Sequence, residues 1–190
     1  MIDFTESTPV DELQGRISKL QQCLQEKELD GCLIIQKTDL FYFSGTSQQG
    51  WLYIPSEGKP LLMIFKEFVR GRAESALEQV VSLVSPKKIP QTLAEGGYEQ
   101  PGSLGMELDV LPVNLFNQYQ NIFSDAQLTD ISLEIRLIRA VKSPYELDLI
   151  RQAAHYSDQV AAKVVDFLEV GKTEVALAGE LEGYARSLGH

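Results

Sequence analysis

The chain has 190 residues, 44% hydrophobic and 23% charged, with a formal net charge of −10. This length suits one domain and part of a second, and the acidic balance argues against a nucleic-acid partner, which needs clustered Lys and Arg. No apolar run reaches the roughly 20 residues that span a bilayer, and the N-terminus carries acid where a signal peptide carries base, so we expect a cytoplasmic protein with no membrane partner.

An amphipathic helix is expected at the start of the chain. Residues 8–11 combine Thr, Pro and Asp, a helix-start signature. Apolar residues then recur every three or four positions at Leu13, Ile17, Leu20 and Leu24. Asp30 and Gly31 end this pattern, and residues 32–36 form a short run that is apolar on both faces. Such a run is typical of a strand that helices cover on both sides.

Short apolar runs then alternate with amphipathic stretches. We expect strands at 40–43, 51–54, 61–65, 80–84, 103–107 and 128–131, the second and third joined by a turn at 55–60. Helices are expected at 67–77, before Gly96 and Gly97, and at 112–122. This mixture of a hairpin and crossover helices predicts the fold class α/β, with a mixed β-sheet flanked by helices.

The last third of the chain is helical. Residues 130–139 form an expected connector, and Ser143, Pro144 and Glu146 match a capping box with Pro at the first helical position. The helix that they open carries a stripe expected to pack against another element: Leu147, Ile150, Ala154, Ser157, Ala161, Val164 and Leu168.

A second helix follows at once. Gly171 is expected to end the first helix and Thr173 to cap the next, whose stripe is Leu177, Leu181, Tyr184 and Leu188. The chain offers these two helices too few partners to bury both stripes. We therefore expect one domain at 1–135, a linker at 136–143, and at 144–190 the beginning of a domain that the chain does not complete, whether by natural truncation or as a cloned fragment.

Few side chains could ligate a metal. Cys23 and Cys32 have neither metal-site nor redox spacing, so we expect buried free thiols. The histidines are His155 and His190, too few for a self-contained zinc site or a histidine-based triad. We assign no catalytic residue and no metal ligand within these 190 residues.

Three stretches carry a resemblance to a known family, in the family's order. Residues 30–45 include a Tyr-x-x-Gly motif, residues 103–107 a Gly-x-Glu motif, and residues 137–174 the two helix starts described above. Together they resemble the N-terminal, creatinase/prolidase-type domain of the pita-bread metallopeptidases (prolidase, aminopeptidase P and creatinase) and the entry into their catalytic domain. The resemblance spans nearly the whole chain and implies a creatinase N-terminal domain-like, ribonuclease H-like fold.

The resemblance also says where the chemistry lies. The family's catalytic domain holds two divalent metal ions through Asp, Asp, His, Glu and Glu, all of which follow the two helices seen here, and no residue of this chain matches them. The two metal ions are therefore implied for the missing domain alone. The resemblance further implies a homodimer, a peptide substrate for the full-length protein, and no activity for residues 1–190 alone.

In relatives of this type the N-terminal domain helps to form dimers and can reach over a partner subunit's active site. This points to the loop at 45–51, so Gln48, Gln49, Trp51 and Tyr42 are our candidate substrate-access residues, with polar groups for hydrogen bonds and aromatic rings for an apolar wall. The alternative is that the aromatic residues are core and the loop is an ordinary turn.

Two charged groups have weaker functional interpretations. Lys66, Arg70 and Arg72 could meet a substrate carboxylate, but a solvated helix face accounts for them as well. Glu107 and Asp109 are two positions apart at a strand end, a spacing that could place both carboxylates on one face. Without a third ligand we interpret this pair as structural.

Our principal hypothesis is that the parent protein is a two-metal Xaa-Pro dipeptidase or aminopeptidase, in which metal-bound hydroxide attacks the scissile carbonyl. Three alternatives stay open: a metal-free relative that acts as a binding or scaffold protein, a creatinase-like amidinohydrolase, and a stand-alone α/β binding domain with a helical dimerisation arm. The metal ligands of the downstream sequence, tests of substrates, and the effect of truncation near residue 140 on dimerisation would separate them.

Overall fold

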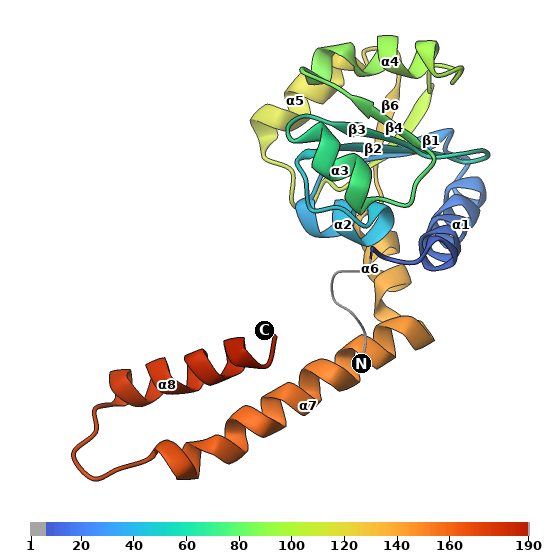
Figure 1. Ribbon diagram of the computed structural model, residues 1–190. Helices are drawn as coiled ribbons and strands as arrows, with labels where there is room; N and C mark the ends of the chain where they lie inside the picture. Colours follow the sequence, from blue (N-terminus) through green and yellow to red (C-terminus); the bar gives the residue numbers. More distant parts are fainter. Residues whose placement is uncertain (1–6, 190) are drawn as a thin grey trace. The chain divides into compact units, whose positions relative to one another are not determined.

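The computed structural model describes residues 7–189 and divides the chain into two compact units (Figure 1). The first unit extends to Val141, and the second begins at Lys142. None of the described helices combines the length and the hydropathy that crossing a bilayer requires.

The first unit is built on one six-stranded mixed sheet. Its strands are β1 (Gly31–Ile34), β2 (Gly50–Pro55), β3 (Leu61–Ile64), β4 (Gln79–Ser82), β5 (Ser103–Met106) and β6 (Gln127–Asp130). They lie in the order β4-β3-β2-β1-β5-β6. The β1–β2 and β2–β3 pairs are antiparallel, whereas β3–β4, β1–β5 and β5–β6 are parallel. The predicted α/β fold with a mixed sheet is confirmed.

Helices cover both faces of this sheet. They are α1 (Val10–Glu26), α2 (Lys37–Ser44), α3 (Phe68–Glu74), the 3₁₀ turn η1 (Pro86–Lys88), α4 (Ile89–Glu95), α5 (Val113–Ile122) and α6 (Ser132–Ala140). Figure 1 shows α4 and α5 on one side of the sheet, with α1, α2, α3 and α6 on the other.

Alternation along the strands supplies a core to each face, because successive strand side chains point to opposite sides. On β2, Leu52 and Ile54 join the core beneath α1, α2 and α6, while Trp51 and Tyr53 join the core beneath α4 and α5. The expected α1 stripe, including Leu13 and its three partners, is buried in the first of these cores. Each such side chain stabilises the fold by roughly 1.5–3 kcal/mol.

Residues 40–43 are helical, so the strand that the sequence predicted there is wrong. Helix α2 begins after Gln36, whose side-chain Oε1 accepts the Asp39 N–H at 2.7 Å. It ends at Gly45, which adopts φ +77° and donates its N–H to Phe41 O. A left-handed φ is readily adopted only by glycine. Periodicity does not distinguish so short an apolar run from a buried turn of helix.

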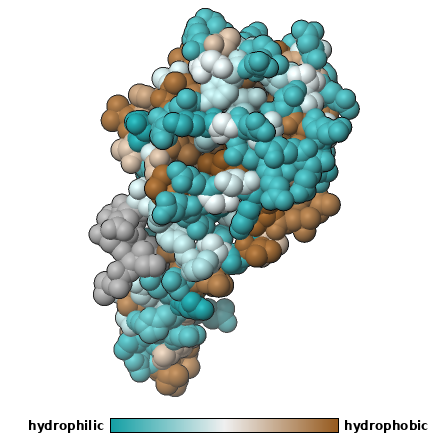
Figure 2. Space-filling model, turned by 90° about the vertical axis from the view of Figure 1, so that its right-hand side faces the viewer, coloured by the Kyte–Doolittle hydropathy of each residue, from teal (hydrophilic) through white to brown (hydrophobic). Residues whose placement is uncertain are grey.

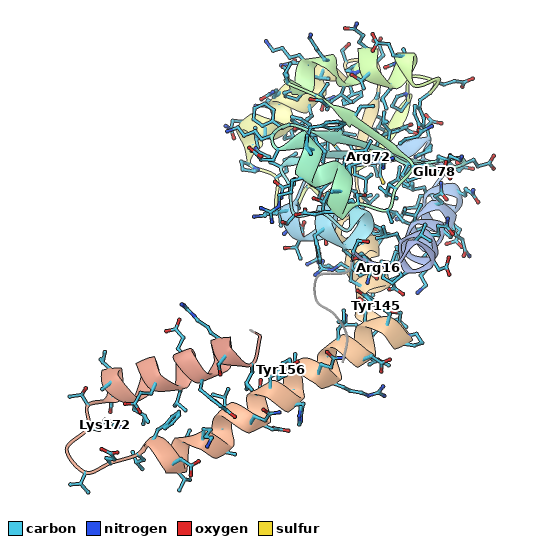
Figure 3. All side chains as sticks on the ribbon, viewed as in Figure 1. Arg16, Arg72, Glu78, Tyr145, Tyr156 and Lys172 are labelled. Carbon is cyan, nitrogen blue, oxygen red and sulfur yellow. The ribbon has the colours of Figure 1, made fainter. Side chains whose placement is uncertain are left out.

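The second unit consists of α7 (Pro144–Phe167) and α8 (Glu174–Ser187). Ser143 and Glu146 form the predicted capping box, and Thr173 caps α8 through the Ala176 N–H. The C-cap of α7 is Leu168 rather than the expected Gly171, which has φ +90° in the connection. There Lys172 Nζ donates to Phe167 O at 2.5 Å and contacts Glu180 at 2.9 Å (Figure 3).

Within residues 142–189 no side chain is buried. The two helices contact each other through positions that include Phe167 and Tyr184, whose rings lie edge to face at 6.2 Å. Of the expected α7 stripe only Val164 is half-buried, while Leu147, Ile150 and Leu168 are exposed. The predicted stripe is therefore not the face that α7 turns to α8.

Candidate functional site

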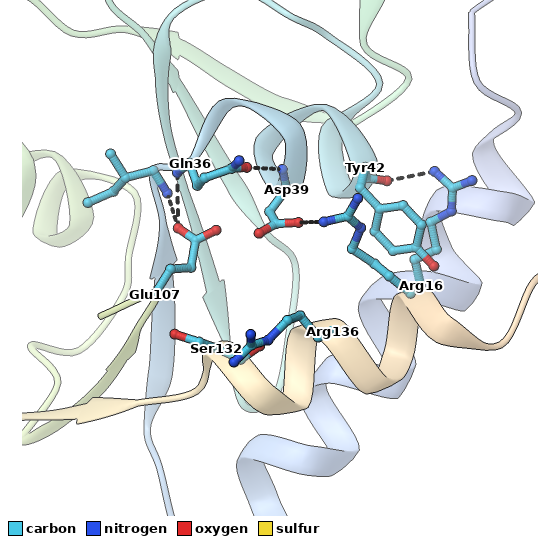
Figure 4. Close-up of polar contacts among 9 residues, drawn as sticks. Arg16, Gln36, Asp39, Tyr42, Glu107, Ser132 and Arg136 are labelled. Carbon is cyan, nitrogen blue, oxygen red and sulfur yellow. Dashed lines mark hydrogen bonds and ion pairs between the residues drawn. The ribbon is translucent and has the colours of Figure 1, made fainter. Parts of the chain in front are cut away.

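A group of charged side chains gathers where β1 and β5 end side by side. Because these two strands are parallel neighbours, the residues that follow them meet at one edge of the sheet. Glu107 follows β5 directly, and its Oε2 accepts the N–H groups of Ile35 at 2.8 Å and Gln36 at 3.0 Å (Figure 4). These two hydrogen bonds stabilise the conformation of the turn between β1 and α2.

The Glu107 carboxyl group is 4% exposed, and its Oε1 receives no hydrogen bond from the described residues. The pKa of Glu107 is raised to about 8, chiefly by burial and also by the neighbouring Asp39, whereas the two backbone N–H donors lower it. Figure 4 shows the two carboxyl groups pointing toward each other. Burial beside Asp39 therefore favours the neutral, protonated form of Glu107 at neutral pH.

Asp39 connects this acid to a set of cations on two other helices. Its Oδ1 accepts a charge-assisted bond of 2.5 Å from Arg139 on α6. The Tyr42 ring has the guanidinium of Arg16 at 4.1 Å and that of Arg139 at 5.7 Å from its centroid. Arg16 also donates to Tyr42 O at 2.7 Å and to Glu12 at 2.8 Å. The cluster joins α1, α2, α6 and the ends of β1 and β5.

The predicted access loop is held by hydrogen bonds to one side chain, that of Glu74. Glu74, in the last turn of α3, accepts hydrogen bonds from Thr46 Oγ1 at 2.6 Å and Gln48 Nε2 at 3.4 Å. The Gln48 N–H in turn donates to Thr46 Oγ1 at 3.1 Å. The hydrogen bond from Thr46 contributes most to lowering the pKa of Glu74, so this anchor is ionised at neutral pH. Gln48 is half-buried and Gln49 is exposed.

The two aromatic candidates lie on opposite faces of the sheet. Trp51 is buried against α5, where its Nε1–H donates to the Tyr119 hydroxyl at 2.6 Å, and it contacts Phe65 edge to face. Tyr42 is buried in the other core, within the Arg16 and Arg139 cluster. The structure therefore brings Gln48 and Gln49 together on the loop but separates Trp51 from Tyr42.

The remaining charged candidates have partners within the fold. Arg70 pairs with Glu74 at 2.6 Å, Arg72 donates to Leu77 O at 2.9 Å, and Lys66 lies over the Phe65 ring. Asp109 pairs with Arg136 at 3.3 Å and is exposed, whereas Glu107 is buried. The two carboxylates have separate surroundings.

Comparison with known proteins identifies the family of the first compact unit. The sequence profile of the Creatinase/Prolidase N-terminal domain matches residues 16–141, which is the first compact unit almost entirely. The chain belongs to this family. The creatinase/prolidase-type domain thus carries the buried carboxyl cluster and the loop described above, and α7 and α8 follow it.

Relatives extend the similarity beyond the matched domain. The chain is 25% identical over 175 residues to the Xaa-Pro dipeptidase of Pyrococcus furiosus, covering 90% of this chain and 47% of that protein. It is 36% identical over 93 residues to the creatinase of a Bacillus species, covering 48% of this chain and 22% of that protein. The Xaa-Pro dipeptidase structure from Bacillus anthracis superimposes with a TM-score of 0.81 at 20% identity, covering 93% of this chain and 50% of that one. The chain spans about half the length of the dipeptidases that it matches.

The described residues do not fit the metal pair that the resemblance implies. Between residues 7 and 189 no three His, Cys, Asp or Glu side chains lie close enough together to hold a metal ion. Near Glu107, the Asp39 carboxylate pairs with the Arg139 guanidinium instead. No step of a metal-dependent reaction is therefore assigned to the residues of this creatinase/prolidase-type domain.

Sequence reasoning missed the roles of Asp39, Arg16 and Arg139. Asp39 and Arg139 are 100 positions apart, and a local pattern carries no information on a pair so distant in sequence. The available signal was the position of Glu107 after β5, because an acid at the end of a buried parallel strand needs donors from a neighbouring turn.

Proposed function

We propose that this chain is the N-terminal accessory portion of a metal-dependent Xaa-Pro dipeptidase or aminopeptidase. The observation that carries the proposal is the extent of the match: the similarity to Xaa-Pro dipeptidases covers about nine-tenths of this chain and so extends past the creatinase/prolidase-type domain. The exposed faces of α7 and α8 supply surface on which the remaining elements of a catalytic domain can pack.

In this proposal the creatinase/prolidase-type domain contributes to dimer formation and to substrate access. Gln48 and Gln49 are the access residues, because Glu74 holds their loop in place while their amide groups stay open to solvent to different degrees. Trp51 and Tyr42 would act indirectly. They stabilise strand β2 and helix α2, which the loop connects.

The test begins with the reading frame beyond the codon for His190. The proposal expects Asp, Asp, His, Glu and Glu in that order within the next couple of hundred residues. The longer protein should then hydrolyse Xaa-Pro dipeptides in the presence of added divalent metal, whereas residues 1–190 alone should not. Turnover by purified residues 1–190 would contradict the accessory role.

A separate variant tests the proposed role of the loop in substrate access. In the full-length protein, changing both Gln48 and Gln49 to Ala should raise KM several-fold with little change in kcat, since a loop that only admits substrate acts before the chemical step. Gln120→Ala, an exposed glutamine on α5, is the matched control and should leave both constants unchanged.

A second candidate is a creatinase-like amidinohydrolase. It is favoured by the 36% identity to creatinase, which is higher than the identity to the dipeptidases but covers 93 residues only. Parallel assays on creatine and on Xaa-Pro dipeptides separate the two activities. A metal-free scaffold protein would hydrolyse neither, and its downstream sequence would lack the five metal ligands.

A further inference from the structure

A pocket of about 440 Å³ opens at the edge of the sheet where β1 begins and β2 ends, opposite the edge that holds Glu107. Its walls come from Asp30, from Tyr53 and the turn after it, and from residues 97–101, which follow α4. The β2–β3 turn lies at the right of Figure 1, and Figure 2, which faces that side, shows hydrophilic side chains over most of it. This pocket plays no part in the proposed function.

Three carboxylates line the pocket without a cation beside them. Asp30, Glu57 and Glu99 belong to its walls, and no Lys, Arg or His does. Asp30 Oδ2 accepts the N–H groups of Gly102 and Ser103, each at 2.8 Å, and the Ser103 N–H bond is the largest cause that lowers the pKa of Asp30. Among the described residues none of the three carboxylates forms an ion pair. The lining therefore carries a negative charge that the fold leaves uncompensated.

The hydroxyl group of a largely buried tyrosine opens to the same space. Tyr53 is 3% exposed and lines the pocket, yet its hydroxyl makes no hydrogen bond with any described residue. The ring extends over Gly31, where an added Cβ would come within 2.7 Å of the hydroxyl oxygen, so the polar tip lies beside Asp30 at the mouth of the pocket. A tyrosine hydroxyl oxygen can accept a hydrogen bond from a ligand donor that enters the pocket.

The aromatic wall is held in place before any ligand arrives. The Tyr98 ring meets Tyr53 edge to face at 5.5 Å. The Tyr98 hydroxyl donates to Lys59 O at 2.8 Å and also contacts Gln79, so this ring is fixed by hydrogen bonds outside the pocket. A wall that is already ordered lowers the entropic cost of binding, and two tyrosine rings next to carboxylates suit an organic cation.

The spacing of the carboxylates argues against a bare metal ion, because among the described residues no three acidic or other ligating side chains converge on one point. We propose that this pocket binds the primary ammonium group of an aliphatic amine, with Tyr53 accepting one hydrogen bond and Asp30, Glu57 and Glu99 supplying the opposing charge. The net charge of −10 strengthens the attraction at low ionic strength. The ammonium group can come from a free polyamine or from a lysine side chain of a peptide.

Isothermal titration calorimetry at low salt tests the proposal with three probes: spermidine, Nα-acetyl-lysine amide, and neutral Nα-acetyl-norleucine amide. Saturable binding of spermidine alone supports a free polyamine, and comparable binding of the lysine amide supports a peptide side chain. The norleucine amide should not bind. Failure of both amines to bind would overturn the proposal.

Two variants locate the binding. Changing Glu57 and Glu99 together to Gln should weaken it about three- to tenfold, as expected for two solvent-exposed charge pairs. The matched control changes Asp125 to Asn and Glu169 to Gln, which alters the net charge equally at exposed positions outside the pocket. Tyr53→Phe keeps the ring and should weaken binding about fivefold. Equal weakening by the Glu57/Glu99 variant and by the control would overturn the proposal, because it would mean that the amine responds to net charge alone.

Discussion

Glu107 shows how burial and hydrogen bonding act in opposite directions on one side chain. Two backbone N–H groups favour the carboxylate, but burial and the neighbouring Asp39 favour the acid and raise the pKa of Glu107 to about 8. The neutral form of Glu107 avoids a second negative charge in this buried position. The Asp39 carboxyl group beside it pairs with Arg139 at 2.5 Å.

This arrangement predicts a pH-dependent stability. The unfolded chain releases the Glu107 proton near its ordinary pKa of 4.5, whereas the folded chain holds it until about 8. Since the folded state binds more protons in this window, the free energy of unfolding should fall as pH rises from about 5 to about 8. The fall should amount to a few kcal/mol, because each pKa unit corresponds to about 1.4 kcal/mol. Urea unfolding measured across this range checks it.

Glu107→Gln should abolish this slope. The amide keeps an acceptor for the two N–H groups and gains a permanent donor toward Asp39, so the variant at pH 8 should be at least as stable as the wild type. Glu134→Gln, which removes a carboxylate that pairs with Lys27 at 2.7 Å on the surface, is the control and should retain the slope. An unchanged slope in Glu107→Gln would assign the pH dependence to other groups.

At the scale of the element, the loop between α2 and β2 depends on α3 for its conformation. Glu74→Ala removes the acceptor of both Thr46 Oγ1 and Gln48 Nε2. We expect amide hydrogen exchange at residues 46–49 to accelerate at least tenfold and the unfolding free energy to fall by about 1–2 kcal/mol. Exchange measured by mass spectrometry tests this, with Glu78→Ala as control, since Glu78 forms only an exposed pair with Lys59. Unchanged exchange in the loop would show that Glu74 does not restrain it.

The helices α2, α7 and α8 show where prediction from the sequence succeeds and where it fails. The capping box at Ser143 and the Thr173 cap were predicted correctly because each depends on residues within one turn. The α2 helix was missed although Asp39 and Gly45 mark its two ends, because four apolar residues in a row suit a buried strand equally well. On α7 the predicted stripe followed helical spacing, but which face α7 turns to α8 depends on contacts such as Phe167 with Tyr184.

At the scale of the whole chain, the sequence predicted a mixed sheet covered on both faces but not the strand order. The run of apolar residues at β1 indicated a strand covered on both faces, and in the structure β1 lies between β2 and β5. The order of the remaining strands, and with it the meeting of Glu107 and Asp39 at one edge, depends on crossovers that carry no local signal. Of the candidate site, the sequence predicted only that the acidic residue Glu107 directly follows the strand β5.

The two units should differ in stability when residues 1–190 are studied alone. The first has two cores with fully buried Leu, Ile and Phe side chains, whereas α7 and α8 bury none and leave Val165 and Val175 about four-fifths exposed. A helix pair of fewer than 50 residues without a core is marginal in water. Limited trypsin digestion should therefore cut within 142–189 at least tenfold faster than within 16–141. A version ending at Val141 should unfold within about 2 °C of the same midpoint, since it keeps both cores of the first unit. Equal protection of both segments, or a large drop in the midpoint on truncation, would mean that α7 and α8 are stabilised by packing that these residues do not display.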